Sequence, residues 1–90
     1  MAVELAARGI RVNAVCPVEV DTPTMNRALA DAPDANQARR EILARYPQGD
    51  AARFVQPLEV AALIAFLAKP EAAPITGAAL PIDFTITAGY

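Results

Sequence analysis

Gly9-Ile10-Arg11-Val12-Asn13-Ala14-Val15-Cys16-Pro17 is the stretch that decides the fold. Its glycine suits the end of a helix, because glycine readily adopts the left-handed conformation that terminates helices. The next seven residues first alternate between apolar and polar side chains and are then all apolar. This pattern predicts a strand over Ile10–Cys16, buried on both faces as in a parallel sheet. The short segment before Gly9 is only about two turns of helix, too little to be stable alone. We therefore expect the sequence to open inside an element whose beginning is missing.

The rest of the chain predicts three helices and a second strand. An apolar segment with proline at its first position predicts the strongest helix over Pro57–Ala68, and an apolar surface on every side predicts that it is buried all round. The other helices are predicted over Pro23–Ala30 and Asn36–Tyr46, and the last short strand near Ala78–Asp83. Parallel sheets need more strands than two. The sequence thus predicts an α/β fold, a C-terminal piece of a Rossmann-like doubly wound parallel sheet with two strands and three to four helices.

Composition excludes several classes of protein. The 90 residues suffice for one small domain, and 54% hydrophobic with 20% charged residues is a globular composition. A net charge of -2 offers no basic surface for nucleic acid or an anionic membrane. One cysteine and no histidine exclude an internal disulfide and most metal sites. The longest apolar run, Val60–Ala68, is far shorter than the ~20 residues of a membrane span, and the chain does not begin as a signal peptide does. We expect a cytoplasmic protein.

Several motifs in the chain, taken together and in this order, resemble the C-terminal third of a short-chain dehydrogenase/reductase. That family reduces carbonyl compounds or oxidises alcohols by passing a hydride from or to NAD or NADP, so the resemblance implies one of these cofactors and a small carbonyl or alcohol substrate. The motifs cover nearly the whole chain and are Ala6–Pro17, Val20–Thr22, Ala52–Ala61, Phe66–Ala68 and Ile75–Asp83.

The groups on which the family's chemistry depends are not among these residues. Its glycine-rich loop, serine and Tyr-x-x-x-Lys come earlier in the family's chains, and neither Tyr46 nor Tyr90 has a lysine four residues on. By the resemblance, residues 1–90 are the C-terminal part of a single NAD(P)-binding Rossmann-fold domain and no complete domain of their own. We expect no catalytic residue and no activity from the chain alone. The alternative is a non-catalytic remnant that acts as a subunit-interaction module.

The resemblance does assign cofactor-binding residues. Pro17 matches the proline after the strand, Val20 the position whose backbone meets the nicotinamide carboxamide, and Thr22 the hydroxyl that bonds the carboxamide or the phosphates. The residues alone leave a second role open for Thr22, because it also precedes a helix that begins with proline and could cap it. Val18 stands where the family usually has glycine, and Phe84-Thr85 where it often has Gly-Gly.

Other polar and apolar groups have simpler interpretations. Cys16, on an apolar strand, is predicted to be buried and inert. Arg11 and Asn13 are predicted to bond the backbone around the strand. The arginines of the helix predicted over Asn36–Tyr46 most simply form a solvated face, rather than binding an anionic substrate; they are Arg39, Arg40 and Arg45. In relatives the helix over Pro57–Ala68 and the last strand contact neighbouring subunits, so the resemblance implies a homo-oligomer formed through them.

Overall fold

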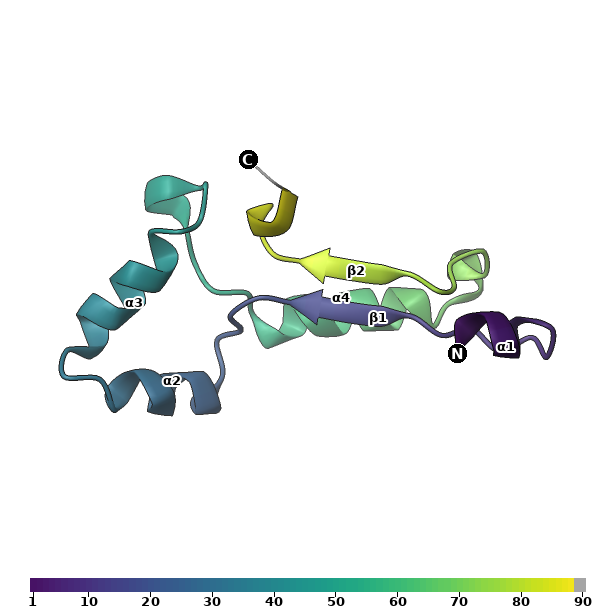
Figure 1. Cartoon of the computed structure of the whole chain (residues 1–90), viewed down its shortest axis with the longest axis horizontal. Helices are drawn as coiled ribbons and strands as arrows, with labels where there is room; N and C mark the ends of the chain where they lie inside the picture. Colours follow the sequence, from purple (N-terminus) through teal and green to yellow (C-terminus); the bar gives the residue numbers. More distant parts are fainter. Residues whose placement is uncertain (89–90) are drawn as a thin grey trace.

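A computed structural model of the chain describes residues 1–88. It contains a parallel sheet of two strands, β1 (Ala14–Pro17) and β2 (Ala79–Ile82), in which Ala14 is paired with Ala79 and Pro17 with Ile82. Helix α4 lies along one face of this sheet, α1 lies beyond its amino end, and α2 and α3 project from its carboxyl end (Figure 1). The elements in chain order are α1 (Ala2–Ala6), β1 (Ala14–Pro17), α2 (Pro23–Ala30), α3 (Ala35–Leu43), η1 (Gly49–Ala51), α4 (Pro57–Leu67), η2 (Pro70–Ala72), β2 (Ala79–Ile82) and η3 (Ile86–Ala88).

The predicted strand over Ile10–Cys16 was too long and began too early. β1 has four residues because β2 offers only four partners. Before β1, the hydroxyl of Thr76 accepts a hydrogen bond from the Val12 amide at 3.1 Å, where a ladder bond would otherwise lie. The predicted burial was also wrong: within the described chain both faces of β1 are largely open, and Cys16 is exposed.

The predicted helix end at Gly9 is confirmed. Gly9 has a φ of 73°, in the left-handed region. Its amide donates to Ala6 O at 3.0 Å, while the Ile10 amide donates to Leu5 O at 3.3 Å. These two bonds are the pair that closes a Schellman motif, and they satisfy carbonyls that the end of α1 would leave unpaired.

The helices predicted from Pro23 and Asn36 are both present. α2 has the predicted bounds, whereas α3 begins one residue early and ends at Leu43 instead of Tyr46. After Leu43 the chain tightens into a turn in which the Tyr46 amide donates to Leu43 O at 3.0 Å. The tighter turn carries the Tyr46 side chain inward, where only 3% of it is exposed.

Helix α4 was predicted over Pro57–Ala68 and ends at Leu67, with Ala68 as its cap. Its start is fixed by Glu59, which accepts the Gln56 amide at 2.8 Å and both guanidinium nitrogens of Arg53 at 2.7 and 2.9 Å. The hydrogen bonds from Arg53 are the main cause that lowers the pKa of Glu59 to about 2.

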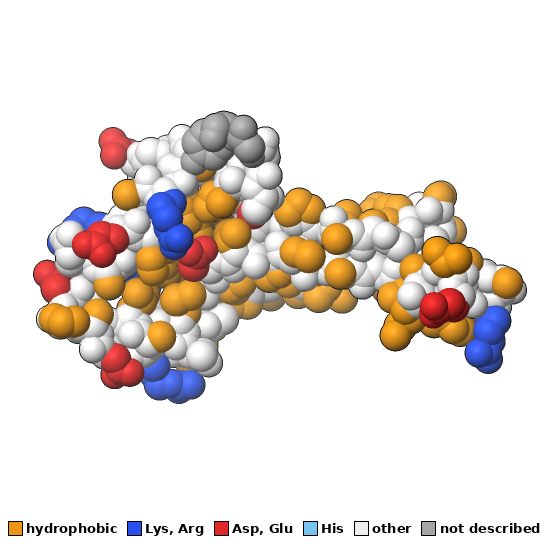
Figure 2. All heavy atoms as spheres, viewed as in Figure 1, with side chains coloured by type: hydrophobic (Ala, Val, Ile, Leu, Met, Phe, Trp, Pro, Cys, Tyr) orange, Lys and Arg blue, Asp and Glu red, His pale blue; other side chains and the backbone are white. Residues whose placement is uncertain are grey.

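The expectation that α4 is buried all round was wrong for the described chain. Only Leu67 is buried in it, whereas Leu58 is 82% exposed, Ile64 53% and Phe66 43%. One face of α4 meets β1 of the small sheet and its end meets η2, while much of the rest of the helix stays exposed. Figure 2 shows the result as a band of hydrophobic side chains along the narrow middle of the molecule, with charged groups gathered towards its two ends.

The shape is extended for a chain of this size. The radius of gyration is 16.5 Å, against roughly 12 Å for a compact domain of the same length. The accessible surface is 6247 Å², against roughly 5,000 Å² for a compact monomer of 9.5 kDa. The buried hydrophobic side chains gather mainly where the helices meet the carboxyl end of the sheet; they are Leu29, Tyr46, Phe54, Val55, Leu67 and Ala72. No helix in the described part of the chain is long and apolar enough to cross a membrane.

Candidate functional site

The carboxyl ends of both strands lie at the same edge of the sheet. Pro17 is paired with Ile82, and just beyond them the Val18 amide donates to Ile82 O at 3.2 Å. In open parallel sheets ligands bind outside this edge, because the loops that follow the strands gather there. The three residues predicted to bind a cofactor all lie at the end of β1 or on the segment that follows it.

Val20 holds this segment against the return of the chain from α3. It forms an isolated parallel bridge with Val55, in which the Val55 amide donates to Glu19 O at 3.0 Å and the Asp21 amide donates to Val55 O at 2.8 Å. Both bonds use the peptide groups on either side of Val20, so its own N–H and C=O face the opposite way. Among the hydrogen bonds of residues 1–88, none uses the N–H or C=O of Val20.

Thr22 is the N-cap of α2, so one of its two predicted roles is confirmed. Its backbone is extended, with φ of −129° and ψ of 160°, and its Oγ1 accepts the Met25 amide at 3.1 Å. A hydroxyl has two acceptor lone pairs and one hydrogen. Capping uses one lone pair, which leaves the Thr22 hydrogen free in chemical terms to be donated to a ligand.

The family usually has glycine at the position of Val18, but the backbone of this chain does not require it. A left-handed backbone would require glycine there, but the residues with positive φ in the described chain do not include Val18. Val18 is half-buried, and its amide is used in the bond to Ile82. The backbone at this position therefore accommodates valine without strain.

The segment after β2 is strained where the sequence departs from Gly-Gly. Phe84 and Thr85 have φ of 50° and 69°, a region that side chains with a Cβ disfavour. The buried carboxylate of Asp83 holds the turn, accepting the Thr85 and Thr87 amides at 3.1 Å each and the Thr87 hydroxyl. The hydrogen bond from the Thr87 hydroxyl is the main cause that lowers the pKa of Asp83.

Thr85→Gly should stabilise the chain. The left-handed backbone costs a residue with a side chain roughly 1–2 kcal/mol, and glycine's extra entropy costs roughly 0.5–1 kcal/mol, so we expect a net gain of about 0.5–1 kcal/mol. The Thr85 side chain is exposed, and the hydrogen bond that the Thr85 backbone amide donates to Asp83 Oδ1 survives the change. Urea unfolding followed by circular dichroism measures the gain. Thr24→Gly, in α2 and also exposed, is the control and should lower stability; equal losses in both variants would show that the turn is not strained.

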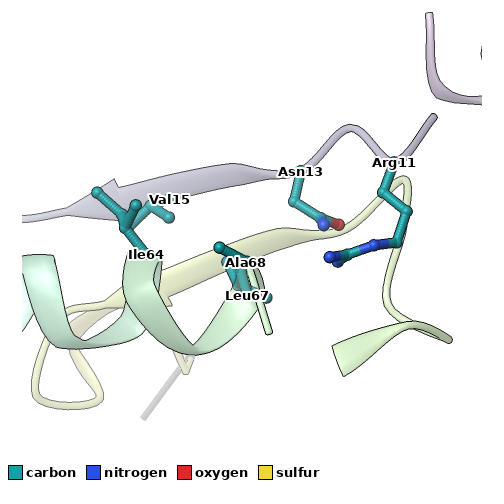
Figure 3. A pocket seen from close by; sticks show the side chains of 6 residues that line it. All are labelled: Arg11, Asn13, Val15, Ile64, Leu67 and Ala68. Atoms are coloured by element: carbon teal, nitrogen blue, oxygen red, sulfur yellow. The ribbon is translucent and has the colours of Figure 1, made fainter. Parts of the chain in front are cut away.

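Arg11 and Asn13 have the structural role predicted for them. Arg11 Nη1 donates to Ala72 O at 3.2 Å, and Asn13 bonds Ile75 O at 3.0 Å and the Ala78 amide at 3.1 Å. They line an open hollow of about 550 Å³ between the start of β1 and the end of α4, shown in Figure 3. This hollow lies at the opposite end of the sheet from Pro17. Its other lining residues are Val15, Ile64, Leu67 and Ala68.

Sequence reasoning missed Glu19 and Tyr46. Glu19 Oε2 accepts the Tyr46 hydroxyl at 2.8 Å, and Oε1 accepts Arg45 Nη2 at 2.9 Å. Arg45 is 65% exposed, as its predicted place on a solvated face requires, and also pairs with Glu19. Arg39 was predicted on the same face but is half-buried, with its guanidinium 4.6 Å from the centre of the Phe54 ring. These pairs join residues far apart in sequence, so no local spacing or motif could have indicated them.

Comparison with known proteins places the chain in a family. A family model described as "Enoyl-(Acyl carrier protein) reductase" matches residues 1–87. The chain belongs to the short-chain dehydrogenase/reductase family. This confirms the resemblance read from the motifs, and with it the assignment to a family of oxidoreductases with a Rossmann-like fold.

Individual members of the short-chain dehydrogenase/reductase family are similar over nearly the whole chain. The 2-(S)-hydroxypropyl-CoM dehydrogenase 3 of Xanthobacter autotrophicus is 39% identical over 88 residues, 98% of this chain and 33% of that protein. The 3-oxoacyl-[acyl-carrier-protein] reductase FabG of Thermotoga maritima is 45% identical over 80 residues, 89% of this chain and 29% of that protein. The chain spans about a third of the length of these relatives.

The fold is shared as well. The crystal structure of a short chain dehydrogenase family protein from Francisella tularensis superposes with a TM-score of 0.86 and 33% sequence identity. The match covers 97% of this chain and 37% of that one. The predicted fold class, a piece of a Rossmann-like parallel sheet, is thereby confirmed.

Proposed function

We propose that residues 1–90 are the C-terminal part of a single NAD(P)-binding Rossmann-fold domain in a cytoplasmic short-chain oxidoreductase. The whole enzyme would reduce a small carbonyl compound or oxidise the corresponding alcohol with NAD or NADP, and this part would hold the nicotinamide end of the cofactor. Membership of the family supports the reaction class. The geometry at the carboxyl edge of the sheet supports the part assigned to this chain.

The observation that carries the proposal is the pair of unused backbone groups at Val20. A nicotinamide carboxamide has one carbonyl acceptor and an amino group that donates. The Val20 N–H and C=O offer the complementary donor and acceptor from a half-buried residue at the sheet edge. Backbone groups in such a position normally find a partner, and a carboxamide would supply one for each.

Thr22 and Pro17 would complete this end of the site. The Thr22 hydroxyl, fixed by its bond from the Met25 amide, would donate its hydrogen to the carboxamide or to a phosphate oxygen. Pro17 would end β1 without an N–H of its own, so the chain can turn away from the sheet beside the cofactor. When bound, the nicotinamide would donate the hydride in carbonyl reduction or accept it in alcohol oxidation.

The chain alone should not catalyse this reaction. A general acid works best when its pKa is near the pH of the reaction, but burial, with the hydrogen bond to Glu19, raises the pKa of Tyr46 to about 12. That hydroxyl is also committed to Glu19 at 2.8 Å. Tyr46 therefore has neither the pKa nor the free hydrogen that the family's tyrosine would need.

A chimaera tests the proposal. Residues 1–88 would replace the corresponding segment of the Thermotoga maritima reductase, and NADH and NADPH affinities would be measured by fluorescence titration. We expect the chimaera to bind one of them, Thr22→Val to weaken binding about five- to tenfold, and Thr22→Ser to restore it. Thr24→Val, the same change on an exposed helical residue, should have no effect.

Two results would contradict the proposal. One is an affinity in the chimaera that is identical with threonine, serine or valine at position 22. The other is NAD(P)-dependent turnover by the purified 90-residue chain, since that would require an acid/base group we have not assigned.

A second function, as a subunit-interaction module, is favoured by one specific observation. Much of α4 is apolar and exposed, with Leu58, Ile64 and Phe66 open to solvent. Monomers seldom expose such a surface. We propose that α4, extended to Ala68, and the neighbouring β2 form a contact between copies in a homo-oligomer, where a two-fold axis would place the same patch on both subunits.

A further inference from the structure

Residues 22–54, here called the excursion, form a separate lobe at the carboxyl end of the sheet. It contains α2, α3 and η1, and Figure 1 shows these elements projecting away from the strands. The excursion leaves the sheet through Glu19–Asp21 and returns at Val55. Its two ends are joined there by the two backbone bonds of the Val20–Val55 bridge.

The side chain of Glu19 makes a second connection at the same place. Its two oxygens accept hydrogen bonds from two consecutive residues just after α3. The donors are Arg45 Nη2 at 2.9 Å and the Tyr46 hydroxyl at 2.8 Å. The Glu19 side chain is only 21% exposed. Bonds to an ionised acceptor that is shielded from water are stronger than bonds between neutral groups.

Tyr46 is the anchor that this carboxylate holds. Its side chain is 3% exposed, and its ring lies 6.1 Å from that of Phe84, between centres, beside the segment that follows β2. A buried hydroxyl needs a partner, since leaving it unpaired costs the desolvation of the group. Glu19 provides that partner, and its negative charge also opposes the ionisation of the phenol.

We propose that Glu19 is a latch that holds the excursion in one position against the segment leaving β1. The Glu19 backbone carbonyl accepts a hydrogen bond from the Val55 amide, and the Glu19 side chain accepts hydrogen bonds from Tyr46 and Arg45. Glu19 therefore connects the segment that enters the excursion with the segment that leaves it. The latch also holds the segment that contains Val20. It does not depend on the cofactor role proposed above and is present without any ligand.

Hydrogen exchange of the 90-residue chain tests the latch. In Glu19→Gln the charge is lost, and we expect the amides of Asp21 and Val55 to exchange about tenfold faster. The amides of Ala14 and Gly77, which donate to Ala78 O at 2.8 Å and Val12 O at 2.7 Å on the sheet side, should change less than about twofold.

The matched control is Glu41→Gln, the same change on an exposed residue of α3 whose carboxylate accepts a hydrogen bond from Gln37 Nε2 at 3.0 Å within the same helix. It should leave all four amides unchanged. Unchanged exchange at Asp21 and Val55 in Glu19→Gln would overturn the latch. Equal acceleration at all four amides would also overturn it, because that pattern is global destabilisation and not release of one lobe.

The phenol of Tyr46 gives a second measurement. With Tyr90→Phe as background it is the only tyrosine in the chain, and the absorbance of its phenolate should rise with a midpoint at a pKa of about 12. Burial, the largest cause of the raised pKa, remains in Glu19→Gln, but the neighbouring negative charge is gone, so the midpoint should move part of the way towards the ordinary value of roughly 10. A midpoint that stays the same would show that Glu19 does not act on Tyr46 in solution.

Discussion

Phe54→Ala should lower the free energy of unfolding by about 3–5 kcal/mol, the largest effect we expect from a single truncation. The Phe54 side chain is 2% exposed, next to Val55 at 1%, and the Arg39 guanidinium covers its ring at 4.6 Å. Alanine would leave a cavity at the point where the excursion meets the sheet. A small, extended chain has little stability in reserve, so the variant should be largely unfolded at room temperature.

Phe66→Ala is the matched control for this change. It removes the same atoms from a side chain that is 43% exposed in α4, so under dilute conditions it should cost less than about 1 kcal/mol. Urea unfolding followed by far-ultraviolet circular dichroism compares the two. Equal losses would mean that Phe54 is not part of a packed core.

Leu67→Glu and Phe66→Glu should have opposite kinds of effect although the residues are adjacent. Leu67 is 9% exposed and faces the sheet, so a carboxylate there would be buried without a partner and should unfold the chain. Phe66 lies on the exposed side of α4. A charge there should leave the fold intact and abolish self-association, since across a two-fold contact it would repel its own copy.

Light scattering and circular dichroism together measure both outcomes. Val3→Glu, in α1 and 89% exposed, is the control for an added surface charge and should neither unfold nor dissociate the chain. A wild-type chain that is folded and monomeric at tens of micromolar would contradict the proposed contact through α4. So would a Phe66→Glu variant that associates as strongly as the wild type.

The sequence predicted the ends of helices well, because these depend on the chemistry of one or two neighbouring residues. Gly9 ends α1 through its left-handed backbone, Thr22 caps α2, and proline opens α4, each as its residue type indicates. The extent of β1 depended instead on its partner, because Ala79–Ile82 allows only four pairs. Burial of α4 likewise depended on what lies against it, which periodicity does not reveal.

The candidate site was predictable in part. The motifs located the segment from Pro17 to Thr22, and the structure places all of it at the carboxyl edge, but cofactor binding by these residues stays a prediction. Glu19 and Tyr46, which hold the segment, are 27 positions apart. Neither has a spacing that distinguishes it from an ordinary surface glutamate or core tyrosine, so only the folded arrangement shows that they meet.

The bridge between Val20 and Val55 has a consequence for the order in which the chain folds. β1 and β2 pair residues 65 positions apart, such as Ala14 with Ala79, whereas the bridge joins Val20 and Val55, which are 35 positions apart. The entropy lost on closing a loop grows with its length. Once the bridge has formed, the residues between Val20 and Val55 no longer add to the loop that must close to pair the strands. The effective length of that loop falls by about half. The sheet that defines the fold should therefore assemble late, after the loop that leads away from it has closed.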